Sequence, residues 1–206
     1  MKVNYSVFLL ALLMIGIFIL QQMFHQVTES LLLTQNAFHE PWRFITAIFI
    51  HGSYQHILFN LFGLILFGFI LEQIIGTKKF LWVFFTTGIL ANLISIFFYT
   101  RSLGASGAIF GVIGTLTILR PLLTVWAFSL PMPLFLASVL WVVGDIIGFF
   151  VPSDIANLAH LSGIGIGLLF GIMFLLAQPR KNPYREKIIL SEEGMKDWEE
   201  RYVKPR

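Results

Sequence analysis

Six stretches of about 20 mostly apolar residues dominate this chain and restrict what it can fold into. A helix of that length matches the hydrocarbon thickness of a bilayer. The chain has 206 residues and is 57% hydrophobic and only 12% charged, whereas soluble domains carry roughly 25% charged residues. We therefore expect an all-α polytopic membrane protein, a bundle of six transmembrane helices. The predicted spans are about 5–23, 54–75, 80–99, 104–120, 133–151 and 155–177.

The segments between the spans suggest one membrane domain with a tail. The first span is long enough to cross a bilayer and no small-residue cleavage site follows it, which favours a retained helix over a signal peptide. The loop 24–53 mixes apolar and polar residues, so we expect it to lie in the membrane interface. Prolines bracket 121–133, a predicted interfacial connection. Residues 1–177 should form the domain and 178–206 a charged cytoplasmic tail.

Basic residues predict the orientation of the bundle. With both termini in the cytoplasm, Arg43 and Arg101 alone among the 14 Lys and Arg residues lie outside. This bias follows the positive-inside rule. Since the net charge of +3 comes largely from the cytoplasmic side, it indicates topology and not nucleic-acid binding. We expect an integral multi-pass protein of the bacterial cell membrane.

Four polar residues inside the predicted spans are candidates for function, because such residues are costly in a bilayer. They are His56 and Asn60 in the second span, Ser106 in the fourth and His160 in the sixth. The four-residue spacing of His56 and Asn60 puts both on one helical face. With helices that alternate in direction, all four residues should occupy one layer in the outer half of the bilayer.

Glycines predict how closely the helices that carry Ser106 and His160 approach. Gly107 follows Ser106 directly, and Gly163 and Gly167 lie on the His160 helix at a spacing of four. Such stripes of small residues let helix backbones pack closely in membranes. If the fourth and sixth spans pack along them, the serine hydroxyl and the imidazole come together.

A serine beside a histidine predicts nucleophilic catalysis with the imidazole as general base. Asp154 lies six residues before His160 and is expected at the surface, so no acidic residue is available to orient the imidazole and the pair should be a dyad. Acyl transfer also needs donors for the oxyanion. His56, Asn60 and the Ser106 backbone N–H are the candidates.

Other interpretations of the same residues stay open. A serine in a glycine-rich helix usually serves packing, and a His/Asn pair could join two helices. The chain has no Cys and no H-E-x-x-H, and the five-residue spacing of His51 and His56 does not align them on a helix. We therefore expect neither a metal nor another cofactor.

The motifs around these residues resemble the rhomboid family of intramembrane serine proteases. "GASG" at 104–107 resembles its G-x-S-G nucleophile motif and "AHLSGIGIG" at 159–167 its A-H-x-x-G-x-x-x-G. "HGSYQHILFN" at 51–60 resembles H-x-x-x-x-H-x-x-x-N, and "WR" at 42–43 the signature of the first external loop. The four motifs occur in the family's order, and the resemblance covers about 40–177.

The resemblance implies a role for each matched residue. Ser106 would be the nucleophile, His160 the base, and His56 and Asn60 the oxyanion hole. The remaining matches have supporting or structural roles: His51 in active-site polar and water organisation, Gly104, Gly107, Gly163 and Gly167 in the motifs, Phe110 stacking on His160, Trp42 and Arg43 anchoring the loop at the interface, and Glu72 as a structural acidic residue. Phe59 and Trp141 are candidate gate residues.

Three functions from different classes remain to be compared. The first is a minimal six-helix rhomboid protease that cleaves single-span transmembrane proteins near the outer bilayer face, with the lipid bilayer as its other partner. The second is a non-catalytic rhomboid-like chaperone or quality-control factor, although such relatives lack the Ser or the His. The third, a transporter or channel, predicts a mid-membrane charge and an inverted repeat, and neither is convincing in this sequence.

Overall fold

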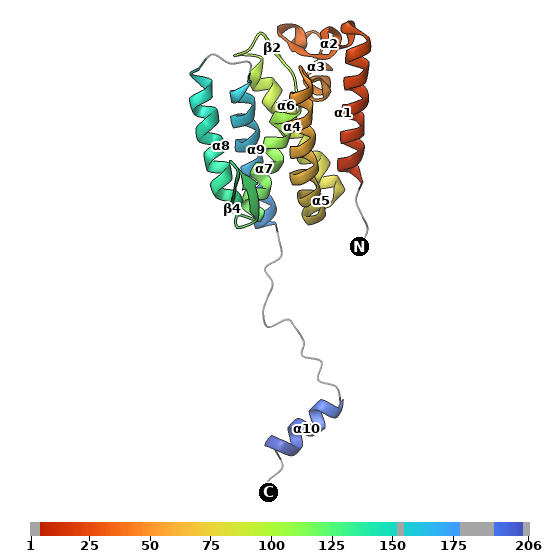
Figure 1. The fold of residues 1–206 in the computed structure, drawn as a ribbon. Helices are drawn as coiled ribbons and strands as arrows, with labels where there is room; N and C mark the ends of the chain where they lie inside the picture. Colours follow the sequence, from red (N-terminus) through yellow and green to blue (C-terminus); the bar gives the residue numbers. More distant parts are fainter. Residues whose placement is uncertain (1–4, 152–154, 178–191, 204–206) are drawn as a thin grey trace. The chain divides into compact units, whose positions relative to one another are not determined.

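The computed structural model describes residues 5–151, 155–177 and 192–203, and it is mostly helical (Figure 1). The chain divides into two units, Met1–Leu176 and Ala177–Arg206. In the described part of the second unit, helix α10 (Glu192–Tyr202) has no buried residue. The remainder of the predicted tail, and Asp154, lie outside the described residues.

Each predicted apolar stretch contains one long helix of the first unit. These helices are α1 (Ser6–Met23), the continuous helix α4 (Tyr54–Gly63), η3 (Leu64–Gly68) and α5 (Phe69–Ile75), then α6 (Thr77–Ser95), α7 (Ser106–Leu119), α8 (Leu134–Phe149) and α9 (Asn157–Leu176). The η3 segment is a π-helical turn within the second long helix. By length and composition, 6–23, 54–75 and 157–176 can cross a membrane, whereas α7 and α8 are shorter apolar helices.

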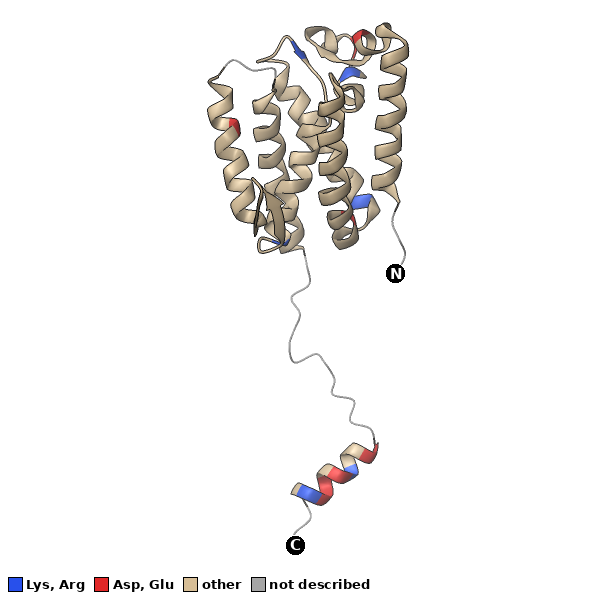
Figure 2. Ribbon diagram, viewed as in Figure 1, with Lys and Arg blue, Asp and Glu red and all other residues tan. Residues whose placement is uncertain are grey.

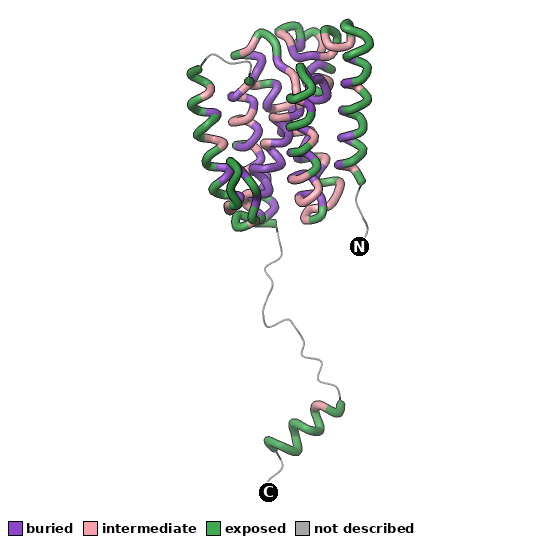
Figure 3. The backbone as a smooth tube through the Cα atoms, in the orientation of Figure 1, coloured by how far each residue is buried: buried purple, intermediate pink, exposed green. Residues whose placement is uncertain are grey.

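Helix α7 forms the centre of this bundle. It packs against α4, α6, α8 and α9, and ten of its fourteen residues are buried. Figure 3 shows burial concentrated on the inner helices, whereas α1 and α8 at the two sides are largely exposed. The exposed faces of α1 and α8 are apolar, with Leu9 and Leu12 on α1 and Val139 and Ile147 on α8. Such surfaces suit contact with lipid rather than water.

Small residues let α7 pack closely on two sides. A Cβ atom at Gly163 of α9 would overlap the carbonyl oxygen of Gly107, and one at Gly167 would overlap that of Gly111. Gly107 and Gly111 of α7 also face α6, because a Cβ at Gly107 would lie 2.8 Å from Cβ of Ala91 and one at Gly111 would overlap the Thr87 side chain. Gly107 therefore lines the contact with α9, as expected, and its missing side chain also makes room for α6.

The loop 24–53 folds around a buried arginine. It contains α2 (His25–Leu31), β1 (Leu33–Thr34), η1 (Gln35–Phe38), α3 (Arg43–Thr46) and η2 (Ala47–Phe49). The Arg43 guanidinium donates hydrogen bonds of 2.8 Å to the carbonyl oxygens of Glu29 and Leu32 and also pairs with Glu40. Trp42 is half exposed. The Arg43 side chain thus holds the loop together by bonding the loop's backbone carbonyl groups, and anchoring at the membrane interface stays a prediction.

Two short strand pairs accompany the helical bundle that the sequence predicts. β1 pairs antiparallel with β2 (Arg101–Ser102), and β3 (Thr124–Ala127) with β4 (Leu130–Pro133). The second pair forms a hairpin within the predicted interfacial connection 121–133, a structure that the sequence did not predict. Its two-residue turn has positive φ at Phe128 (53°) and Ser129 (64°), which is the geometry of a tight hairpin.

Glu72 ties three helices together at the opposite end of the bundle from the start of α7. Its buried carboxylate accepts hydrogen bonds from the Ser6 hydroxyl, from the Val7 backbone N–H and from the Thr77 hydroxyl. These bonds join the end of α5 to the starts of α1 and α6. Paired in this way, a buried carboxylate stabilises the bundle where an unpaired one would be costly.

Candidate active site

Ser106 and His160 meet at one end of the bundle. Ser106 is the first residue of α7, and His160 lies in the first turn of α9. The Ser106 Oγ atom lies 2.8 Å from Nε2 of His160. The glycine contacts bring these two helices together just below the pair, so the packing sets the distance between hydroxyl and imidazole.

The His160 ring is held flat against Phe110. The two ring centroids are 4.4 Å apart and their planes differ by 5°. Phe110 lies one helical turn after Ser106 on α7, which places its ring on the same side as the hydroxyl. Trp141 of α8 in turn packs edge-on against Phe110, at 6.4 Å between centroids. The aromatic contacts therefore fix the plane of the imidazole.

The structure corrects the expectation that no acidic residue reaches His160. Asp145 of α8 lies with its Oδ1 atom 2.9 Å from Nδ1 of His160. It is buried, with 9% of its surface exposed, and it is the one charged residue of α8, visible as the red segment of that helix in Figure 2. The sequence held a signal for it, since a charge inside an apolar stretch is a functional candidate by default.

The His56 ring packs against Gly104, two residues before Ser106, because glycine leaves room for it. Gly104 has a positive φ of 116°, and a Cβ there would lie 2.7 Å from Nε2 of His56. The Gly52 backbone N–H approaches Nδ1 of His56 at 3.5 Å. This contact favours the tautomer that carries its proton on Nε2, on the side of Gly104. His56 can thus present an N–H donor to the cleft.

Asn60 lines the same cleft, and its side-chain amide makes only some of the hydrogen bonds it can form. Its Nδ2 atom donates to the carbonyl oxygen of His56 at 2.8 Å. Its Oδ1 atom is buried without a hydrogen-bond partner in the described part of the protein. An amide nitrogen carries two protons, so one N–H remains for a ligand. The oxyanion role of Asn60 stays a prediction.

His51 is buried behind His56 and is neutral. Its backbone exchanges two hydrogen bonds of 3.1 Å with the Gln21 side chain, and its Nδ1–H points to the carbonyl oxygen of Phe49 at 3.2 Å. Burial, reinforced by the neighbouring His56, lowers the pKa of His51 from 6.5 to about 3 in spite of the bond to Phe49. The two imidazole rings pack edge to face at 5.1 Å. His51 therefore supports the position of His56.

A cleft of about 1250 Å³ opens over these residues. Ser106, His160, His56 and Asn60 all line it. Its other lining residues come from α4, η3, α7 and α8 and from the segments 52–53, 98–103 and 155–156. They include the aromatic residues Phe59, Phe67, Phe110 and Trp141. The proposed gate residues Phe59 and Trp141 thus lie at this cleft, and their gating role stays a prediction.

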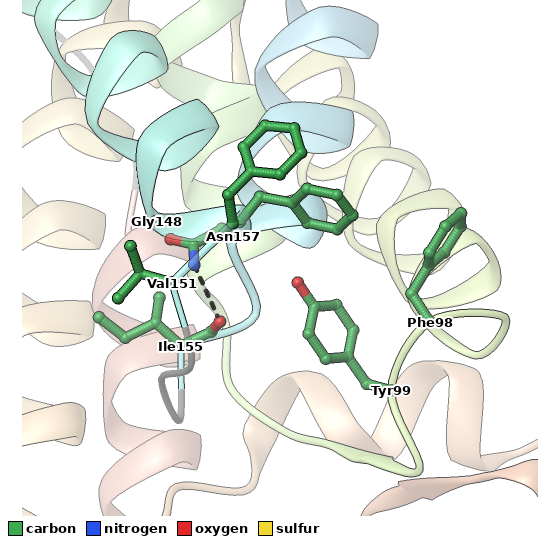
Figure 4. A pocket seen from close by; sticks show the side chains of 8 residues that line it. Phe98, Tyr99, Gly148, Val151, Ile155 and Asn157 are labelled. Carbon is green, nitrogen blue, oxygen red and sulfur yellow. Dashed lines mark hydrogen bonds between the residues drawn. The ribbon is translucent and has the colours of Figure 1, made fainter.

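A smaller cavity of about 350 Å³ lies at the start of α9, and Tyr99 and Asn157 line it (Figure 4). The Tyr99 hydroxyl, which follows α6, accepts a hydrogen bond from the Leu158 backbone N–H at 3.2 Å. The Asn157 amide donates to the carbonyl oxygen of Ile155 at 3.2 Å, the dashed line in Figure 4. These bonds satisfy groups at a helix start and fix the turn that carries His160. Tyr99 was not anticipated from the sequence.

No group of three or more His, Cys, Asp or Glu side chains suited to a metal ion occurs among residues 5–151, 155–177 and 192–203. The polar groups that converge on the cleft instead form a hydroxyl, an imidazole and hydrogen-bond donors. This arrangement suits nucleophilic acyl transfer.

Comparisons with known proteins show which family this chain resembles. The model of the rhomboid domain family matches residues 39–177. Rhomboid protease GlpG of Haemophilus influenzae is 35% identical over 69% of this chain and 73% of its own length. RHOMBOID-like protein 1 of Arabidopsis thaliana is 33% identical over 67% of this chain, and RHOMBOID-like protein 6, mitochondrial, of the same plant 32% identical over 69%.

The chain belongs to the rhomboid family, and it is an integral membrane protein. It spans 36% of the length of RHOMBOID-like protein 1 and 46% of that of RHOMBOID-like protein 6. The family match begins at residue 39, so it includes the buried Arg43 and every residue of the Ser106–His160 cleft.

Proposed function

We propose that this protein is an intramembrane serine endopeptidase that cleaves single-span transmembrane proteins. The observation that carries the proposal is the 2.8 Å contact between Ser106 Oγ and His160 Nε2 in an apolar cleft. A hydroxyl at this distance from an imidazole can transfer its proton as it attacks a carbonyl carbon. A non-catalytic chaperone has no use for such a pair.

The proposed reaction has two steps. Ser106 Oγ attacks the scissile carbonyl while its proton passes to His160 Nε2, and the same proton then leaves with the amine of the departing peptide. A water molecule next attacks the acyl-enzyme ester, giving its proton to His160, which returns it to Ser106. His56, the second N–H of the Asn60 amide and the Ser106 backbone N–H would stabilise the oxyanion in both steps. As the first residue of α7, Ser106 has a backbone N–H that no intrahelical carbonyl can satisfy.

We also propose how the protein is oriented in the membrane. Six spans with both termini in the cytoplasm, in a bacterial cell membrane, would put the cleft in the outer half of the bilayer. Substrates would be transmembrane segments that enter near that face, and the basic residues at the other end support this orientation.

Labelling and cleavage together test the proposal. The full chain in detergent should react with a fluorophosphonate and cleave a model single-span substrate reconstituted with it. Ser106→Ala and His160→Ala should each abolish turnover while the helix content stays unchanged. Turnover that persists in Ser106→Ala would contradict the serine mechanism, and binding of the substrate segment without any cleavage by the wild type would favour the chaperone.

A further inference from the structure

We propose that Asp145 is a positioning residue that turns the Ser106–His160 pair into a triad. The inference rests on the protease function proposed above. One imidazole joins the two partners: Nε2 lies 2.8 Å from Ser106 Oγ, and Nδ1 lies 2.9 Å from Asp145 Oδ1. Three helices, α7, α8 and α9, each supply one member.

A hydrogen-bond acceptor beside Nδ1 matters because it affects which ring nitrogen of His160 carries the proton. To accept the Ser106 proton, Nε2 must be unprotonated, so the single proton of the neutral ring must sit on Nδ1. A carboxylate can only accept hydrogen bonds, and Asp145 therefore selects this tautomer. When the serine proton reaches Nε2, the ring becomes a cation 2.9 Å from the negative carboxylate. The proton then leaves from Nε2 with the amine, and no proton passes to Asp145.

Phe110 and Asp145 constrain different motions of the same ring. Stacking on Phe110 at 5° fixes the plane of the His160 imidazole. A half-turn about the Cβ–Cγ bond would keep that plane and carry Nδ1 and Nε2 to the opposite side. The bond to Asp145 favours the one orientation in which Nε2 points to Ser106. The stacking alone cannot do this.

The position of Asp145 fits the connection between its helix and the next. Asp145 lies four residues before the end of α8, and His160 lies three residues after the start of α9. At 1.5 Å of rise per residue, both are roughly one helical turn from the connecting segment, so the two side chains meet at the same depth. A carboxylate that is 9% exposed in an apolar bundle is costly unless it is paired. The hydrogen bond to His160 offsets this cost and at the same time positions the proposed catalytic imidazole.

Asp145→Asn is the first variant to measure, because its amide can donate to Nδ1 and favour the wrong tautomer. We expect kcat to fall by about 10² to 10⁴ with KM unchanged and the melting temperature close to that of the wild type. Ser138→Ala is the matched control. Ser138 is also a buried polar residue of α8, but it bonds the Thr117 hydroxyl at 2.7 Å, away from the cleft, so this variant should keep its kcat.

Adding Asp145→Asn to the His160→Ala variant separates a role in positioning the imidazole from a role in the stability of the fold. Since Asp145 acts only through the imidazole, Asp145→Asn should cost nothing further when it is added to His160→Ala, with the fluorophosphonate labelling rate of Ser106 as the readout. A wild-type kcat in Asp145→Asn would overturn the triad, and so would an equal loss in both backgrounds. Ser106→Ala is measured alongside: if it retains turnover, the protease proposal itself fails, whereas an inactive Ser106→Ala beside a fully active Asp145→Asn overturns only the triad.

Discussion

Gly163 of α9 lies directly against the backbone carbonyl of Gly107 in α7, with no space for a Cβ atom between them. Because the obstacle is backbone, it cannot be relieved by a side-chain rotation. Ser106 and His160 lie within one turn of this contact. The separation of the proposed nucleophile and base therefore depends on two residues that have no side chains.

The first prediction is that Gly163→Ala impairs stability and activity together. Forcing a methyl group into this contact should cost about 1–3 kcal/mol of unfolding free energy or more and move Ser106 away from His160. Gly165→Ala is the control on the same helix, since a Cβ there meets nothing within 4 Å. Melting temperature and substrate turnover, measured for both variants, check this. Full activity in Gly163→Ala would show that close packing does not set the site.

The second prediction concerns Gly104, which has a positive φ and lies against His56. Gly104→Ala should lower kcat, because its Cβ would displace the imidazole that we propose as an oxyanion donor. Gly76→Ala is the control: Gly76 also has a positive φ, of 80°, but open space around it. Both variants should lose about 1–2 kcal/mol of stability from backbone strain. Equal kcat values in the two would contradict the placement of His56.

The third prediction tests the oxyanion donors themselves. Asn60→Ala and His56→Ala should each lower kcat by about 10² to 10³ with little change in KM, because these donors act mainly in the transition state. The serine should still react slowly with a fluorophosphonate. Leu58→Ala, a change at an exposed apolar position of the same helix, should keep wild-type kinetics. A raised KM with unchanged kcat would assign the two residues to substrate docking instead.

The fourth prediction is a loss of stability in acid that depends on His51. Its pKa is about 3 in the folded protein and 6.5 in the unfolded chain, so between these values the unfolded chain binds more protons. The stabilising contribution is complete above pH 6.5 and is lost as the pH falls towards 3. Melting temperatures of wild type and His51→Gln between pH 4 and 8 should show a flatter acid side for the variant. The exposed His39→Gln should follow the wild type, and parallel curves for all three proteins would exclude this role of His51.

Sequence patterns located the long helices because hydropathy is a local property. Each apolar stretch predicted from the sequence contains one helix, with ends that differ by a few residues. The hairpin at 124–133 was missed because the bracketing prolines were interpreted only as an interfacial connection. Its register depends on pairing between Thr124 and Pro133, which no single segment encodes.

The same limit explains which site residues sequence analysis found. Ser106, His160, His56 and Asn60 occur in motifs with fixed spacing. Asp145 belongs to no such motif and was not considered, because the search for an acidic partner of His160 went only as far as Asp154 along the same stretch and not to the preceding helix. Tyr99 is further removed still, since its hydroxyl bonds a backbone N–H 59 positions later in the chain.

The central position of α7 makes its sequence far less replaceable than those of its neighbours. The helix that begins with Ser106 is enclosed on several sides, so nearly every substitution along it changes both folding and chemistry. By contrast, the outward faces of α1 and α8 are exposed and apolar, and the lipid that such faces suit accepts apolar side chains of many shapes. Sequences with this architecture should therefore diverge freely at positions such as Leu12 and Val139. Evolution can thereby adapt the molecule to bilayers of different composition without disturbing its nucleophile.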